Sequence, residues 1–163
     1  MQVTLKGNPV ELEGVQPIKG DKAPNFSLLD LNDTLVELSA SINNPLIISV
    51  VPDIDTSVCA LQTKRFNQEA ATETGINFVT ISNNTKEEQS NWCAAEGVEM
   101  TMLRDADLEF AKNYGLLIPA IDRLARAIFV VDSKGTIVYE EIVPEVSQEP
   151  DYAKALEAAK ALI

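Results

Sequence analysis

The chain has 163 residues, 45% of them hydrophobic and 23% charged, which fits a single globular domain spanning residues 1–163. Its formal net charge of −12 opposes binding to nucleic-acid phosphates and to anionic membranes, so neither is expected as a partner. The sequence has no histidine, which excludes Ser-His-Asp triads and histidine-ligated metals. It has none of the glycine spacings of dinucleotide-binding or P-loop proteins, so these two classes of nucleotide enzyme lose support.

The hydrophobic periodicity predicts strands and helices that alternate along the chain. The expected strands span residues 3–5 and 10–12, which form an N-terminal hairpin, then 25–29, 35–38, 46–51, 76–81, 100–103, 126–131 and 136–143. The expected helices span about 57–74, 86–96, 107–114 and a C-terminal segment after Pro150. Strand 46–51 is apolar apart from Ser49, which is typical of a strand buried on both faces near the centre of a sheet. The pattern therefore predicts an α/β domain with a mixed central sheet.

The N-terminal residues do not combine a basic start with a following apolar stretch, and the longest apolar runs are too short to cross a bilayer. We therefore expect a cytoplasmic protein. The chain has two cysteines, Cys59 and Cys93. A reducing compartment disfavours a permanent structural disulfide, so this pair indicates either redox chemistry or inert burial.

Cys59 is expected in the first turn of the helix that follows the apolar strand, with Thr56 or Ser57 as its cap. Free backbone N–H groups and the helix dipole favour a thiolate at that position, and a thiolate is a nucleophile. An inert buried cysteine explains the position equally well. Asp53 and Asp55 would oppose ionisation if they pointed at the sulfur, so a reactive Cys59 needs a cation nearby.

The residues around Cys59 have the pattern of a known family. Pro52, Thr56 and Cys59 follow the apolar strand in the order and spacing of the peroxiredoxin active-site motif. Segments 7–10, 64–67, 124–127 and 149–152 extend the likeness. Together these residues resemble the bacterial thiol peroxidases, which are atypical two-cysteine peroxiredoxins, over essentially the whole chain. The resemblance implies a thioredoxin-like fold, with the mixed sheet flanked by helices.

The resemblance also implies a role for each residue of the site. Cys59 would be the peroxidatic cysteine, which a hydroperoxide oxidises to a sulfenic acid, and Cys93 the resolving cysteine, which closes an intramolecular disulfide. Thr56 would hydrogen-bond the substrate or the thiolate, Arg126 would supply fixed positive charge, and Pro52 would shield the sulfur. The implied substrates are hydrogen peroxide and alkyl hydroperoxides, the implied reductant is thioredoxin, and the implied assembly is a homodimer. No cofactor or metal is expected.

Each of these residues also has a structural interpretation. Thr56 is equally explained as a plain N-cap, Arg126 as half of a surface ion pair, and Cys93 as a small hydrophobic residue beside Trp92. Because both cysteines are expected within helices, a disulfide between them would require local unwinding. The segment 116–125 lacks the glycine usual in the family, so the pocket there is expected to differ in shape.

Two other functions remain open from the sequence. Asp53 and Asp55 after a buried strand resemble the nucleophile motif of haloacid-dehalogenase-like phosphatases, although Pro52 interrupts that motif and Ser57 replaces its usual Thr or Val. A non-enzymatic thioredoxin-like binding module is the third interpretation. Thiol-dependent consumption of peroxide distinguishes the first function from both alternatives.

Overall fold

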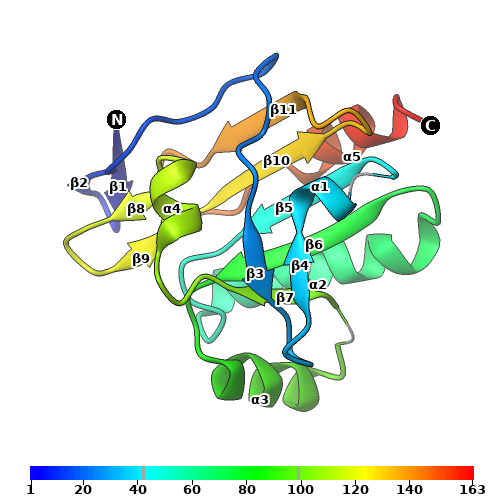
Figure 1. Ribbon diagram of the computed structural model, residues 1–163. Coiled ribbons are helices and arrows are strands. Elements are labelled where there is room, and N and C mark those ends of the chain that lie inside the picture. The colour runs from blue at the N-terminus through cyan, green and yellow to red at the C-terminus, as the bar shows by residue number, and fades with distance from the viewer. Residues whose placement is uncertain (42, 99) are drawn as a thin grey trace.

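The structure is a computed structural model that describes residues 1–41, 43–98 and 100–163 (Figure 1). The strands are β1 (Gln2–Leu5), β2 (Asn8–Glu11), β3 (Ser27–Leu29), β4 (Leu35–Glu37), β5 (Leu46–Val50), β6 (Asn77–Ser82), β7 (Met102–Arg104), β8 (Leu117–Ile118), β9 (Arg123–Leu124), β10 (Ala127–Val131) and β11 (Ile137–Ile142). The helices are α1 (Leu38–Ser41), α2 (Ser57–Thr72), α3 (Lys86–Glu96), α4 (Glu109–Asn113) and α5 (Tyr152–Lys160).

Seven strands form one mixed sheet in the order β11-β10-β5-β6-β7-β3-β4. β5, β6 and β7 run parallel to one another, and β10 is antiparallel to β5, so that Ile47 lies between Phe78 of β6 and Val130 of β10. Every residue of β5 is buried, as the sequence predicts for this strand. Two further strand pairs, β1–β2 and β8–β9, lie outside this sheet.

Two helices cover one face of the sheet. In Figure 1, α2 and α5 lie behind the strands, and both contribute to one apolar layer. Phe66 of α2 and Leu156 of α5 pack in this layer with Ile47. Because side chains alternate along a strand, Ser49 points toward the same helices as Ile47 does. This orientation brings the single polar residue of β5 to the helix that carries Cys59.

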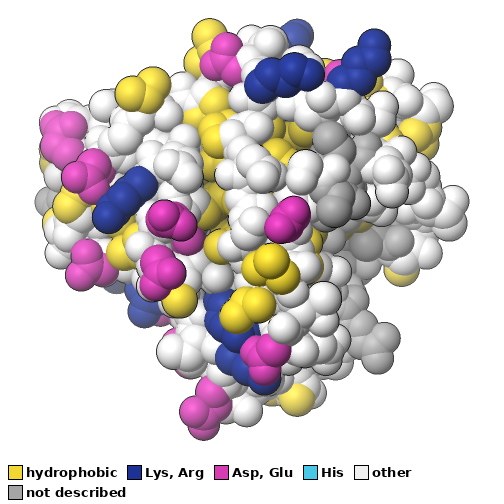
Figure 2. All heavy atoms as spheres, in the orientation of Figure 1, with side chains coloured by type: hydrophobic (Ala, Val, Ile, Leu, Met, Phe, Trp, Pro, Cys, Tyr) yellow, Lys and Arg dark blue, Asp and Glu magenta, His cyan; other side chains and the backbone are white. Residues whose placement is uncertain are grey.

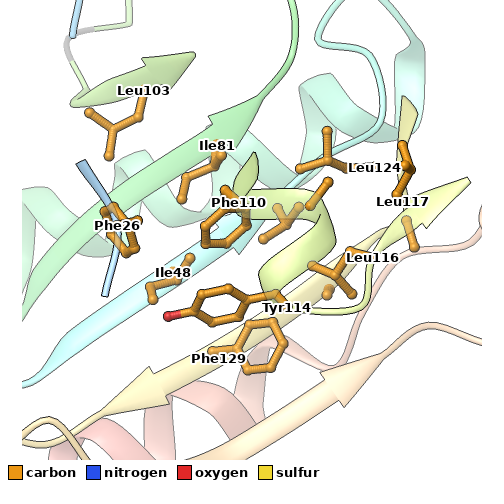
Figure 3. Close-up of a cluster of buried hydrophobic side chains, with 14 of the residues drawn as sticks. Phe26, Ile48, Ile81, Leu103, Phe110, Tyr114, Leu116, Leu117, Leu124 and Phe129 are labelled. Atoms are coloured by element: carbon orange, nitrogen blue, oxygen red, sulfur yellow. The ribbon is translucent and has the colours of Figure 1, made fainter. Parts of the chain in front are cut away.

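The opposite face of the sheet is covered by α4 and by aromatic side chains (Figure 3). The rings of Phe110 and Tyr114 stack with their centroids 4.3 Å apart, and Tyr114 meets Phe129 of β10 edge to face. The Tyr114 hydroxyl donates to the carbonyl of Pro24 at 2.7 Å, which satisfies its only polar group. Burying each of these large side chains contributes about 2 kcal/mol to folding.

The predicted N-terminal hairpin is confirmed, but its turn is shorter than expected. Lys6 and Gly7 alone form the turn, with φ of 51° and 82°, and Asn8 and Pro9 belong to β2. Left-handed conformations at both turn residues match the twist of the paired strands, which explains the tight connection.

The remaining differences from the predicted elements are local. The sequence did not predict the short helix α1 or the β8–β9 pair. Strands of two residues are too short to show a hydrophobic periodicity. They are held by contacts with distant segments, such as the hydrogen bond that Glu13 N–H donates to the Leu117 carbonyl at 2.8 Å. Helix α4 is shorter than predicted because Leu108 is left-handed, with φ of 60°, and α4 starts after it. The Asp105 carboxylate accepts from the N–H groups of Phe110 and Ala111 there.

The surface agrees with the acidic composition. Figure 2 shows carboxylate side chains scattered over one face, with scattered hydrophobic side chains between them. Within the described ranges, no helix has the length and apolar character needed to cross a bilayer.

Candidate active site

Cys59 lies in the first turn of α2, just beyond the carboxyl end of β5, and its side chain is completely buried. The chain turns through Pro52 and Asp53 before the helix begins at Ser57. This turn is closed by Thr56, whose N–H and hydroxyl both donate to the Asp53 carbonyl, at 3.1 and 2.9 Å. The predicted placement of Cys59 at the helix start is confirmed.

Arg126 reaches Cys59 because of the strand register. Ala127, the first residue of β10, pairs with Val50, the last residue of β5, so the start of one strand lies beside the end of the other. The Nη2 of Arg126 donates to Cys59 Sγ at 3.3 Å across a sequence separation of 67 residues. Arg126 is only 2% exposed, so its interpretation as a surface ion pair is wrong.

The guanidinium of Arg126 is fixed by three hydrogen bonds. Besides the bond to Cys59, Nη1 donates to Gln62 Oε1 at 3.0 Å and Nε donates to the Val146 carbonyl at 2.8 Å. Gln62 in turn donates to Ser49 Oγ at 2.8 Å. Among the residues that the structure describes, no carboxylate pairs with this buried cation. The sulfur of Cys59 is therefore the group toward which this unpaired charge is directed.

The Asp53 carboxylate makes its contacts with groups other than Cys59 and Arg126. Its Oδ1 accepts from Asp55 N–H at 3.1 Å and from Asn84 Nδ2 at 3.0 Å, and its Oδ2 lies 3.7 Å from Arg123 Nη2. Asn84 also accepts from Ile54 N–H at 2.9 Å. Two different arginines thus serve the site, since Arg123 balances Asp53 while Arg126 contacts the sulfur.

Thr56 occupies the N-cap position of α2, but its side chain caps no helical N–H, so the plain N-cap interpretation is wrong. Its hydroxyl proton is used on the Asp53 carbonyl. The hydroxyl oxygen keeps acceptor lone pairs at the wall of the pocket that adjoins the site. Thr56 is exposed there, so a hydroperoxide O–H could donate to it.

A pocket of about 510 Å³ adjoins the site, and Cys59 is buried beyond its wall. Its lining comes from five parts of the chain, namely the β1–β2 hairpin, the turn and first helical residues after β5, the β8–β9 hairpin, Arg126 just before β10, and the segment after β11. The residues that line this pocket are Leu5, Lys6, Pro52, Asp53, Thr56, Ser57, Val58, Ile121, Arg123, Arg126, Val146 and Ser147. The apolar share of this lining suits a substrate with a small hydrocarbon group.

Cys93 lies on α3 and is 9% exposed. It packs in one apolar cluster with Cys59 and Trp92, and neither cysteine is bonded to another sulfur. Burial raises the pKa of the Cys93 thiol, which therefore favours its neutral form. The same residue borders a second pocket of about 530 Å³, lined in part by Met100 and Met102.

Three participants in the site escaped the sequence analysis. Gln62 could have been found from its position one helical turn after Cys59, opposite the single polar residue of β5. Asn84 follows β6, and the carboxyl ends of parallel strands meet at one edge of a sheet. Val146 contributes a backbone carbonyl, for which a sequence has no signal.

Comparisons with known proteins agree with this arrangement. The Redoxin family profile matches residues 18–156. The thiol peroxidase of Listeria innocua is 46% identical over 161 residues, which cover 98% of each chain, and that of Bacillus subtilis is 41% identical over 164 residues, covering 99% of this chain and 98% of the relative. The crystal structure of a peroxiredoxin-like protein from Aquifex aeolicus superposes with a TM-score of 0.93 at 32% identity, over 99% of this chain and 97% of that one.

The fold and the matched profile are those of the redoxins, a class of thioredoxin-like proteins. Within this class, the chain belongs to the thiol peroxidase family. It is thus a peroxidase of the oxidoreductase class. The phosphatase interpretation loses its basis, because the carboxylate of Asp53 is held by Asn84 and Arg123.

Proposed function

We propose that this protein reduces hydrogen peroxide and alkyl hydroperoxides with Cys59 as the peroxidatic cysteine. The observation that carries the proposal is the contact of Arg126 Nη2 with Cys59 Sγ at 3.3 Å, in a buried site where no carboxylate of the described residues competes for the guanidinium. A fixed cation beside a thiol at a helix start favours the thiolate, and the thiolate is the reactive form.

In the proposed first step, the Cys59 thiolate attacks the terminal oxygen of the hydroperoxide. The O–O bond breaks, the alkoxide or hydroxide leaves with the bonding pair and takes up a proton, and Cys59 becomes a sulfenic acid. Arg126 stabilises the negative charge that develops along the S–O–O line. Thr56 accepts a hydrogen bond from the substrate, and Pro52 shields the sulfur at the pocket wall.

In the second step, the thiolate of Cys93 attacks the sulfur of the Cys59 sulfenic acid, forming a disulfide and breaking the S–O bond. The hydroxide that leaves takes up a proton from solvent and becomes water. The packing of both side chains in one apolar cluster supports this pairing. Because burial raises the pKa of Cys93, that thiol must become exposed before it reacts. A dithiol protein of the thioredoxin type then returns the disulfide to two thiols.

The proposal extends to assembly and compartment. Ile121 in the loop between β8 and β9 is 43% exposed at the pocket rim, and an apolar side chain there suits a contact with a second copy of the chain, in a homodimer. Two free thiols that cycle through a disulfide need a reducing compartment, which favours the cytoplasm.

The test is hydroperoxide consumption with thioredoxin, thioredoxin reductase and NADPH. Cys59→Ser is expected to abolish consumption. Cys93→Ser is expected to consume one equivalent of peroxide and then to stop at the sulfenic acid. The buried thiol of Cys93 serves as the matched control, so full turnover by Cys59→Ser would overturn the assignment.

A further inference from the structure

Glu145 lies in the connection between β11 and α5, and its carboxylate gathers hydrogen bonds from the N-terminal hairpin. Oε1 accepts from the Thr4 hydroxyl at 2.9 Å and from Gly7 N–H at 2.7 Å. Oε2 accepts from Lys6 N–H at 3.2 Å, from Ser147 N–H at 2.7 Å and from the Ser147 hydroxyl. These bonds, those from Ser147 foremost, lower the pKa of Glu145 to about 2. The side chain is therefore a carboxylate throughout the neutral range.

The residues on either side of Glu145 are tied to the same strand. Thr4 N–H donates to the Pro144 carbonyl and Val146 N–H donates to the Thr4 carbonyl, both at 2.7 Å. The segment 144–146 thus runs beside β1 as a short parallel partner. Together with the carboxylate, these bonds fix the backbone of Val146 in place.

The carbonyl of Val146 is the acceptor for Arg126 Nε at 2.8 Å. The same guanidinium donates through Nη2 to Cys59 Sγ. A continuous set of contacts therefore runs from the Glu145 carboxylate through Val146 and Arg126 to the sulfur. Leu5, next to the turn that Glu145 holds, lines the pocket beside this sulfur.

We propose that Glu145 is a positioning residue for peroxide reduction, which ties the N-terminal hairpin to the segment of Val146 and so holds Arg126 in the orientation that contacts Cys59. The inference rests on the proposed function and deepens it. A carboxylate suits this position because all five of its hydrogen bonds are accepted. The amide of a glutamine would turn an NH₂ donor toward backbone N–H groups.

The test compares Glu145→Gln with the wild type in the second-order oxidation of Cys59 by hydrogen peroxide, measured across pH. We expect the rate to fall about tenfold, because small misplacements of a catalytic group are costly. We also expect the midpoint of the pH–rate profile to move upward, because a looser guanidinium stabilises the thiolate less. Glu157→Gln, on the exposed side of α5, is the matched control and should change neither quantity.

The same substitution in an Arg126→Met background tests the route of the effect. If Glu145 acts through Arg126, Glu145→Gln should have no further effect on the rate or on the midpoint. An undiminished effect in that background would overturn the inference. So would a Glu145→Gln protein that loses thermal stability but keeps the wild-type rate and pH profile.

Should Glu145→Gln fail to fold, Thr4→Val removes a single donor to the carboxylate. We expect that variant to lower the rate about threefold with the same upward movement of the midpoint, and no change in either would overturn the inference. Failure of the proposed function is recognised separately, because full turnover by Cys59→Ser refutes it whatever Glu145 does. If Arg126→Met slows the oxidation of Cys59 while Glu145→Gln and Thr4→Val keep the wild-type rate, only the positioning role of Glu145 is refuted.

Discussion

The surroundings of Cys59 and Cys93 differ in polarity although both thiols are buried in one apolar cluster. Cys59 accepts a hydrogen bond from Arg126, whose other nitrogens are held by Gln62 and Val146. The pKa of the Cys93 thiol is shifted by burial alone, and burial raises it. Depth of burial therefore does not distinguish the proposed peroxidatic cysteine from the proposed resolving cysteine. The fixed cation does, because it stabilises the charged form that burial alone disfavours.

The two helices that carry the cysteines also begin differently. α3 has a complete capping box, in which Thr85 Oγ1 accepts from Glu88 N–H at 3.2 Å and Glu88 accepts from Thr85 N–H at 2.9 Å. Lys86 adds an ion pair with Asp33 at 2.6 Å. α2 has no side-chain cap from Thr56. The first turn of α2 is therefore the less firmly held of the two helix starts.

The largest effect is expected when the two arginines of the site are replaced one at a time. Arg126→Met should slow the oxidation of Cys59 by peroxide about a hundredfold, because it removes the donor aimed at the reacting sulfur. Arg123→Met should slow it far less, because Arg123 balances Asp53 and not the sulfur. Stopped-flow measurement of Trp92 fluorescence provides both rates. Equal rates in the two variants would contradict the distinction.

The next largest effect concerns where the protein opens when the disulfide forms. In the oxidised protein we expect amide exchange at residues 57–63 to be about tenfold faster than in the reduced protein, because this turn lacks a side-chain cap. Residues 86–96 should change less. Hydrogen exchange with mass spectrometry measures both segments, with peroxide-treated Cys93→Ser as the control. Faster exchange confined to 86–96 would reverse the ranking of the two helices.

A smaller effect is expected from the caps themselves. Thr85→Ala should lower the free energy of unfolding by about 1 kcal/mol, because it breaks the capping box of α3. Thr56→Val should lower that free energy by less, because its side chain caps no helical N–H and loses only an exposed hydrogen bond to the Asp53 carbonyl. The same variant should still slow peroxide reduction. Urea denaturation gives the two free energies, and a larger loss for Thr56→Val would show that the α2 start is the better held.

The smallest expected effect is a displaced pH profile for Cys93. In Cys59→Ser, alkylation of Cys93 by iodoacetamide should still rise above about pH 8.5, where an ordinary cysteine is half ionised. The reason is that burial raises the pKa of this thiol, so less thiolate is present at any given pH. Repeating the titration in urea removes the burial and should restore an ordinary profile. Identical profiles in buffer and urea would contradict the difference in environment.

The sequence was sufficient for the elements that depend on local signals. Residues 86–96 were predicted as a helix ended by Gly97, and α3 has these bounds because Gly97 takes the left-handed conformation that closes it. The apolar run at 46–51 predicted an interior strand, and β5 is one. The apolar strand and the candidate caps Thr56 and Ser57 after it placed Cys59 at a helix start, and α2 begins at Ser57.

Only the tertiary structure decided which distant groups meet that thiol. Arg126 was singled out by its resemblance to the family, but the antiparallel register of β10 against β5 brings it to the sulfur. Gln62 and the carbonyl of Val146 belong to the site because they accept hydrogen bonds from the guanidinium of Arg126. This guanidinium is buried by packing, so its donors need partners within the protein. Local sequence determines helix starts and strand burial through short-range hydrogen bonds and periodicity. The environment that we propose makes Cys59 a nucleophile depends on contacts between segments that only the folded sheet brings together.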